Sequence, residues 1–92
     1  MTTGTTASGT YYLFNKKDQD VPIVFVHGVG LTHEIWQPQL EFFNYHSTLA
    51  YDILGHGKSS LKNKEIGFDD FSDQLIGLMD HLNIKKIHLV GF

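Results

Sequence analysis

Residues 23–30 read Ile-Val-Phe-Val-His-Gly-Val-Gly, and this stretch decides the fold class. Its first four residues are apolar without alternation, which is typical of a strand buried on both faces of a parallel sheet. The glycine-rich turn that follows would place backbone N–H groups at the carboxyl edge of such a sheet, where ligands of open α/β sheets bind. The same turn could instead connect a strand to a helix without binding anything, and the motif alone leaves both interpretations open.

Further strands and two helices are predicted around this strand. Apolar stretches at 11–14, 48–53 and 87–90 have the length and composition of strands. A short amphipathic helix is indicated by the spacing of Trp36, Leu40 and Phe43, and Asn83 is expected to end a longer helix that begins at residue 68. The apolar face of the longer helix comprises Phe68, Phe71, Leu75, Leu78, Met79 and Leu82. Alternating strands and helices predict an α/β fold with a mostly parallel sheet flanked by helices.

A second glycine-rich turn, DILGHGKS at residues 52–59, ends the strand predicted at 48–53. Its glycines allow the chain to turn sharply, while the side chains of Asp52 and Ser59 can satisfy loose backbone donors. No strand-turn-helix elbow surrounds Ser59, so it is not a candidate nucleophile. His27 and His56 lie in the two turns, where we expect hydrogen bonding rather than catalysis. The residues interpreted as structural turn residues are His27, Asp52, Gly55, Gly57 and Ser59.

Two nucleotide-binding motifs are matched only in part. The tripeptide at 57–59, Gly-Lys-Ser, ends like a P-loop, but Asp52 stands where that loop needs its first glycine. Gly28 and Gly30 begin like a dinucleotide fingerprint, whose third glycine is replaced by His33. A P-loop is therefore set aside, and a dinucleotide-binding module is kept as an alternative of a different class.

A metal site is not predicted. His33 and Glu34 begin like the helix of a zinc protease, but Gln37 replaces the second histidine ligand. The chain has no cysteine, which excludes a disulfide framework and thiolate ligands.

The composition of the 92 residues suits one small globular domain. The net charge of −3 favours neither nucleic acid nor an anionic membrane as a partner. Residues 1–10 are small and polar, lack the apolar core of a signal peptide, and are expected to form a flexible N-terminus. We therefore expect a cytoplasmic protein.

Four motifs in order resemble the α/β-hydrolase family of the AB hydrolase-1 type. They are HGVG after a strand, Trp36 in the first helix, DILGHGKS, and IHLVGF at residues 87–92. Among members of that family, HGVGLTHEIWQPQ followed by YDILGHGKSS is most similar to 3-oxoadipate enol-lactonase-like esterases. The resemblance implies that residues 11–92 are the N-terminal part of a truncated α/β-hydrolase domain.

The resemblance also assigns roles to residues. It implies that the backbone N–H of Val29 is an oxyanion-hole donor and that Gly28, Gly30 and Trp36 line the substrate pocket. Gly91 and Phe92 match the start of the G-x-S-x-G elbow, so the catalytic serine would come directly after Phe92. The family's acid and histidine would lie further along, and no cofactor or metal is implied.

The implied function is that of a fragment of a serine-type hydrolase, which acts on a small-molecule ester, lactone or related acyl bond. The chain itself would lack the catalytic triad and be inactive. A non-catalytic binding protein of the same fold stays open as an alternative.

Overall fold

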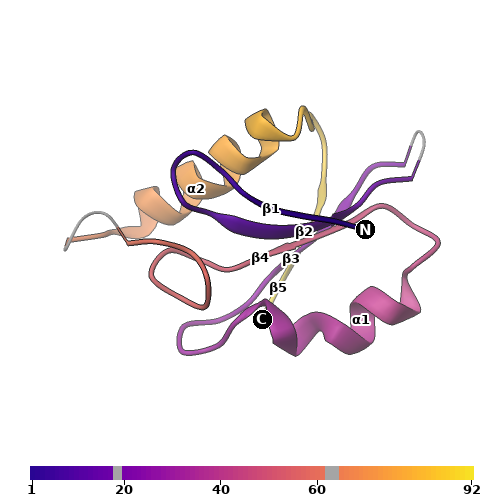
Figure 1. Cartoon of the computed structure of the whole chain (residues 1–92), viewed down its shortest axis with the longest axis horizontal. Helices are drawn as coiled ribbons and strands as arrows, with labels where there is room; N and C mark the ends of the chain where they lie inside the picture. The colour runs from indigo at the N-terminus through magenta and orange to yellow at the C-terminus, as the bar shows by residue number, and fades with distance from the viewer. Residues whose placement is uncertain (18–19, 62–64) are drawn as a thin grey trace.

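The computed structural model describes residues 1–17, 20–61 and 65–92. Five strands form one sheet, and two α-helices and one 3-10 turn pack on it (Figure 1). The strands are β1 (Thr2–Thr5), β2 (Tyr11–Asn15), β3 (Ile23–Val26), β4 (Thr48–Tyr51) and β5 (His88–Gly91). The helical elements are η1 (His33–Trp36), α1 (Gln37–Phe42) and α2 (Phe68–His81).

The strand order in the sheet is β1-β2-β4-β3-β5. β3 runs parallel to both β4 and β5, whereas β2 is antiparallel to β1 and β4. All strands except β2 therefore point the same way, and the predicted mostly parallel α/β fold is confirmed. Their carboxyl ends meet at one edge of the sheet, which brings the turns after β3 and β4 together.

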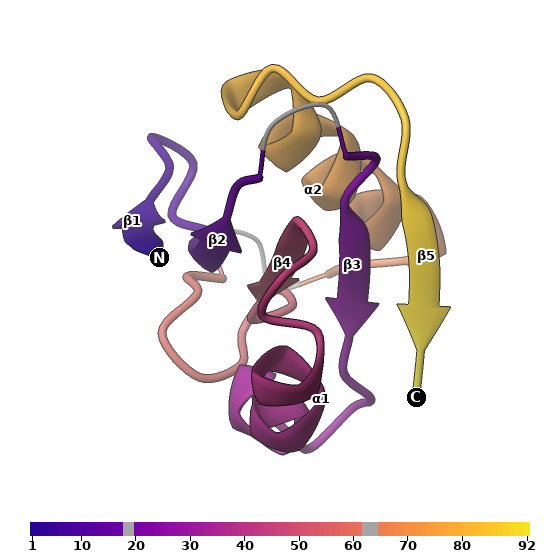
Figure 2. The same ribbon diagram turned by 90° about the vertical axis from the view of Figure 1, so that its right-hand side faces the viewer.

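The two helices cover opposite faces of the sheet, so the fold has three layers (Figure 2). Val24 packs into the cluster between the sheet and α2, and its neighbour Phe25 packs with Trp36 on the α1 side. Successive side chains of a strand point to opposite faces, so a strand between two helical layers must be apolar throughout. This arrangement explains the continuous apolar run at 23–26.

The expectation that residues 1–10 form a flexible N-terminus is wrong. Thr2–Thr5 forms strand β1, which pairs with β2 in the register Thr2↔Phe14. The connecting turn is closed by the buried side chain of Thr6, whose Oγ1 accepts the N–H of Thr10 at 3.1 Å. Small polar composition suggested a disordered lead-in, but β-branched threonine also favours strands once an edge is available for pairing.

The long helix was predicted well except at its first turn. Leu78 on the predicted apolar face is 1% exposed, but Phe68 is 92% exposed, because the helix begins beyond the sheet it covers. Asn83 ends the helix as expected, with a φ of +57°, and the N–H of Ile84 donates back to the Met79 carbonyl at 2.8 Å. The sequence also predicts a polar surface loop over residues 58–67, of which residues 62–64 lie outside the described residues.

The helices of the described residues are too short or too polar to traverse a lipid bilayer.

Candidate functional site

The turn after β3 has a backbone N–H at the carboxyl edge of the sheet that donates to none of the described residues. The N–H of Leu31 donates to the carbonyl of Gly28 at 3.1 Å, which closes a four-residue turn with Val29 and Gly30 at its centre. Gly30 has a φ of +87°, a conformation that favours glycine. Val29 is 83% exposed, and its N–H donates to none of the described residues. An N–H in this position is available to a ligand oxygen.

The end of β5 lies beside this turn. The N–H of Phe92 donates to the carbonyl of Val26 at 3.0 Å, and the Phe92 carbonyl oxygen lies 3.5 Å from where a side chain on Gly28 would begin. The ring of Phe92 also lies 6.4 Å, centre to centre, from the ring of Trp36, the last residue before α1. The last residue of the chain and the turn at 28–31 therefore share one corner of the molecule.

Asp52 links the turn after β3 to the turn after β4. Its fully buried carboxylate accepts the backbone N–H of His33 at 2.7 Å, the Nδ1–H of the His33 ring at 2.8 Å and the N–H of Lys58 at 2.9 Å. Burial alone would raise the pKa of Asp52, but the hydrogen bonds from Lys58 and His33 and the nearby imidazole outweigh it and hold that pKa below its ordinary value. The charged carboxylate therefore links the two turns through its hydrogen bonds.

This geometry also explains why residues 57–59 are no P-loop. In a P-loop the backbone N–H groups bind phosphate oxygens. Here a carboxylate oxygen of Asp52 already occupies the N–H of Lys58. The ammonium of Lys58 lies over the ring of Tyr11, 4.8 Å from its centre, rather than over the turn.

Two histidines hold the turns together through both ring nitrogens. His27 Nε2 accepts the N–H of Ile53 at 3.0 Å, so its Nδ1 carries the proton and donates to the Gly28 carbonyl at 2.8 Å. His56 Nε2 accepts the N–H of Gly30 at 2.9 Å, and its Nδ1–H donates to the Leu54 carbonyl at 2.9 Å. Both rings are therefore neutral donors and acceptors, and neither has a nitrogen left to move a substrate proton.

The remaining turn residues shape the backbone around Asp52. Ser59 is buried, donates its hydroxyl to the Asp52 carbonyl at 2.6 Å and accepts the N–H of Tyr11 at 2.9 Å. Gly55 and Gly57 have φ values of +72° and +49°. A side chain on Gly57 would collide with the carboxylate of Asp52. Each of these residues serves the geometry of the turn.

Sequence reasoning missed Gln74 and the true partner of His33. Gln74 lies on α2, accepts the N–H of Leu54 at 3.1 Å, and donates to the carbonyl of Asp52 at 3.0 Å and to Thr10 Oγ1 at 3.1 Å. His33 was considered only as a metal ligand, whereas the structure pairs it with Asp52. Gln74 is one of several polar residues on a helix with one apolar face, so the sequence contained little indication of its role.

Trp36 lies in the core rather than in an open pocket. Its ring is 4.9 Å from the ring of Phe25 and 6.4 Å from that of Phe92, in an edge-on arrangement. The residue is 6% exposed, and its indole N–H is buried without a partner among the described residues. The substrate-pocket role of Trp36, Gly28 and Gly30 stays a prediction, as does the oxyanion role of Val29.

Metal-binding groups do not gather in the described stretches 1–17, 20–61 and 65–92, where no three His, Cys, Asp or Glu side chains could hold one ion. The histidines of the turns donate to or accept from backbone and carboxylate groups instead.

Known proteins are similar to this chain in sequence and in fold. The sequence pattern of the alpha/beta hydrolase fold matches residues 21–92. The chain is 37% identical over 71 residues to (E)-2-((N-methylformamido)methylene)succinate hydrolase and 32% identical over 71 residues to 3-oxoadipate enol-lactonase 1, both from Acinetobacter baylyi. These matches cover 76% and 75% of this chain but 27% and 26% of the relatives. The chain thus spans about a quarter of their length.

Among solved structures, the enol-lactonase from Burkholderia xenovorans superposes with a TM-score of 0.87 at 23% identity, covering 99% of this chain and 36% of that one. The likeness extends over the sheet, both helices and the turns described above. The predicted resemblance to enol-lactonase-like proteins is confirmed, and the chain belongs to the α/β-hydrolase fold family.

Proposed function

We propose that this chain supplies the oxyanion-binding turn of a serine-type hydrolase that cleaves an ester, lactone or related acyl bond of a small molecule. The observation that carries the proposal is that the N–H of Val29, an exposed residue at the carboxyl edge of the sheet beside Phe92, donates to none of the described residues. In this family the nucleophile stands on an elbow directly after the strand that corresponds to β5. The residue after Phe92 would then face the turn at 28–31.

The mechanism gives the turn a defined task. A serine oxygen attacks the acyl carbon, a histidine takes the serine proton and returns it to the leaving oxygen, and an acid orients the histidine. The carbonyl oxygen becomes an oxyanion in this step, and the N–H of Val29 donates to it together with the N–H after the nucleophile. His27 and His56 are not that histidine, because both of their ring nitrogens are engaged.

The names of the relatives support the acyl-bond assignment. One is an enol-lactonase and another hydrolyses a substituted succinate. Both matches span the turns at 28–31 and 52–59, which carry the candidate site described above.

The proposal is tested first by reading the gene beyond the codon for Phe92. Ser-x-Gly, with an acid and a histidine further along, supports it. Asp in place of Ser contradicts acyl transfer and indicates dehalogenase or epoxide hydrolase chemistry. A stop codon, or Gly or Ala in that place, contradicts catalysis and favours a binding protein of the same fold.

The role of Val29 is tested in the protein expressed from the full reading frame with p-nitrophenyl esters and a lactone. Val29→Pro removes the N–H but suits the turn, because proline is favoured before a glycine of positive φ. We expect kcat to fall about 10²–10³-fold, the usual effect of losing one oxyanion donor. Val29→Ala keeps the N–H and is expected to keep kcat. Equal kcat in both variants would show that Val29 is no oxyanion donor.

A further inference from the structure

We propose that a cavity at the opposite end of the sheet binds a small organic anion through lysine side chains. The cavity has a volume of about 280 Å³ and lies where β3 and β5 begin, whereas the turn at 28–31 follows the end of β3. Its volume is close to the lower limit of small-molecule sites, roughly 300 Å³. The proposal is independent of the hydrolase assignment.

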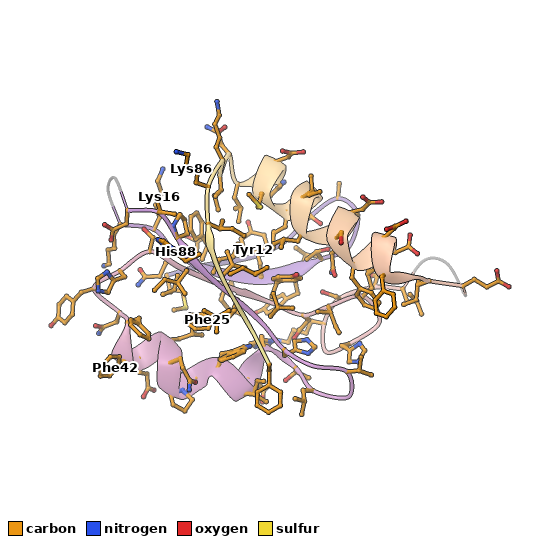
Figure 3. The ribbon with its side chains drawn as sticks, turned by 180° about the vertical axis from the view of Figure 1, so that it is seen from behind. Tyr12, Lys16, Phe25, Phe42, Lys86 and His88 are labelled. Carbon is orange, nitrogen blue, oxygen red and sulfur yellow. The ribbon has the colours of Figure 1, made fainter. Side chains whose placement is uncertain are left out.

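Lysines from two distant segments line this cavity. Lys16 and Lys17 follow β2, and Lys85 and Lys86 precede β5. Figure 3 shows Lys16 and Lys86 at the same end of the molecule. The fold therefore brings together cationic side chains that lie nearly 70 residues apart in the chain.

The described lining of the cavity has a charge opposite to that of the chain. Four of the seven basic residues line the cavity, whereas the chain as a whole has a net charge of −3. The acidic residue among the described lining residues is Asp20, whose carboxylate lies 3.9 Å from Nδ1 of His46. None of the four lysines pairs within 4.0 Å with an acidic group of the described residues.

A purely structural explanation accounts for only half of this cluster. Lys85 and Lys86 follow the carboxyl end of α2, where the helix dipole favours cations. Lys16 and Lys17 come from the segment after β2 and have no such helix end of their own. All four lysines are exposed, and their like charges repel one another with a strength that falls off over a screening length of roughly 8 Å at physiological ionic strength. A bound anion would relieve that repulsion.

The apolar part of the cavity decides what kind of anion fits. Phe14 is 8% exposed, and Leu82 and Ile84 are partly buried against the core. A carboxylate or phosphate group would face the ammonium groups, and an aryl or alkyl body would cover the apolar lining. Inorganic phosphate uses only the first of these contacts.

The test is calorimetric titration of the full chain with phenyl phosphate, with inorganic phosphate and benzyl alcohol as partial ligands. We expect phenyl phosphate to bind more tightly than either. The variant Lys16→Gln/Lys86→Gln should weaken it by about tenfold, because each charge-assisted contact contributes severalfold even when partly exposed. Lys58→Gln is the control, since Lys58 lies over Tyr11 and outside the cavity, and it should change the affinity less than twofold.

A second readout separates binding from loss of structure. Without ligand, Lys16→Gln should leave Tm unchanged or raise it, because it removes repulsion at a residue that stabilises no helix end, and phenyl phosphate should raise the Tm of the unsubstituted chain more than that of the variant. Three results would overturn the proposal. They are no binding of phenyl phosphate, equal binding of benzyl alcohol or inorganic phosphate, and equal weakening by Lys58→Gln.

Discussion

The carboxylate of Asp52 occupies the space that a side chain on residue 57 would need. Gly57 also has a φ of +49°, so an added Cβ is strained by the backbone as well as by the contact. We expect Gly57→Ala to lower the free energy of unfolding by at least about 2 kcal/mol, measured by urea denaturation, since the left-handed conformation alone costs about 1–2 kcal/mol. Gly67→Ala, where a Cβ meets nothing within 4 Å, is the control. Equal losses in both variants would contradict the close contact.

His56 is expected to hold the turn at 28–31 in place. His56→Phe keeps a ring of similar shape but removes the acceptor for the Gly30 N–H and the donor to the Leu54 carbonyl. We expect hydrogen exchange of the Gly30 amide to accelerate by about tenfold, because one net hydrogen bond contributes about 1 kcal/mol. Exposed His46, substituted in the same way, should leave that amide unchanged. Unaltered exchange at Gly30 in His56→Phe would show that the bond contributes nothing to the turn.

Individual roles were predictable only where a residue serves its own turn. The sequence indicated that Asp52 satisfies a backbone donor of its turn, and its carboxylate does accept the N–H of Lys58. Ser59 was expected to do the same, but it donates to the carbonyl of Asp52, and the backbone N–H that it accepts is that of distant Tyr11. It did not identify His33 as the partner of Asp52, 19 residues away, or Gly30 as the donor to His56, 26 residues away. Those contacts depend on the side-by-side register of β3 and β4, which hydrophobic periodicity does not specify.

At the scale of elements, α2 carries a glycine with no structural need for it. Gly77 lies in the helix interior and is exposed, and an added Cβ would meet nothing within 4 Å. Gly77→Ala should raise the free energy of unfolding by about 0.5–1 kcal/mol, because alanine loses less backbone entropy on folding. The change is measured as a shift in the urea concentration at the midpoint of unfolding, with the slope of the free energy against urea concentration unchanged. A lower midpoint would contradict the open environment of Gly77.

Strands with a continuous apolar run were predictable, whereas the edge of the sheet was not. The boundaries of β3 follow directly from its buried sequence. β1 was missed because its threonines and glycine contribute little apolar area, and its strand conformation depends on pairing with β2. Phe68 was misassigned because periodicity identifies a helix face but not where the helix leaves the sheet. Tertiary contacts decided each of these cases.

At the scale of the whole molecule, the parallel strands give the sheet two chemically different ends. The carboxyl end collects the turns whose backbone N–H groups are held by buried Asp52 and His27 and by partly buried His56. The opposite end carries the lysine-lined cavity. The family pattern predicts the first end. The second end could not be predicted from the sequence, because only the fold brings residues 16–17 and 85–86 to one cavity.

The stability of the whole molecule should decline at both extremes of pH, for two different buried groups. The pKa of Asp52 is below its ordinary value in the folded chain, so its contribution to stability is present above the unfolded pKa and is lost as pH falls through the folded one. Burial raises the pKa of Tyr51 from 10.0 to about 12. The folded chain then keeps the phenol proton that the unfolded chain releases, so stability is full below about pH 10 and declines as pH rises toward 12.

The alkaline decline should amount to roughly 1.4 kcal/mol per pH unit between these two values, on the order of 2–3 kcal/mol in total. Urea denaturation across a pH series measures it, and ultraviolet absorbance of the phenolate locates the titration of Tyr51. Tyr51→Phe should abolish the alkaline decline, and Tyr45→Phe should not, because Tyr45 is 84% exposed. Asp52→Asn should reduce the loss of stability at low pH and leave the alkaline decline unchanged. If the alkaline decline persists in Tyr51→Phe, another group causes it, and the burial of Tyr51 does not explain it.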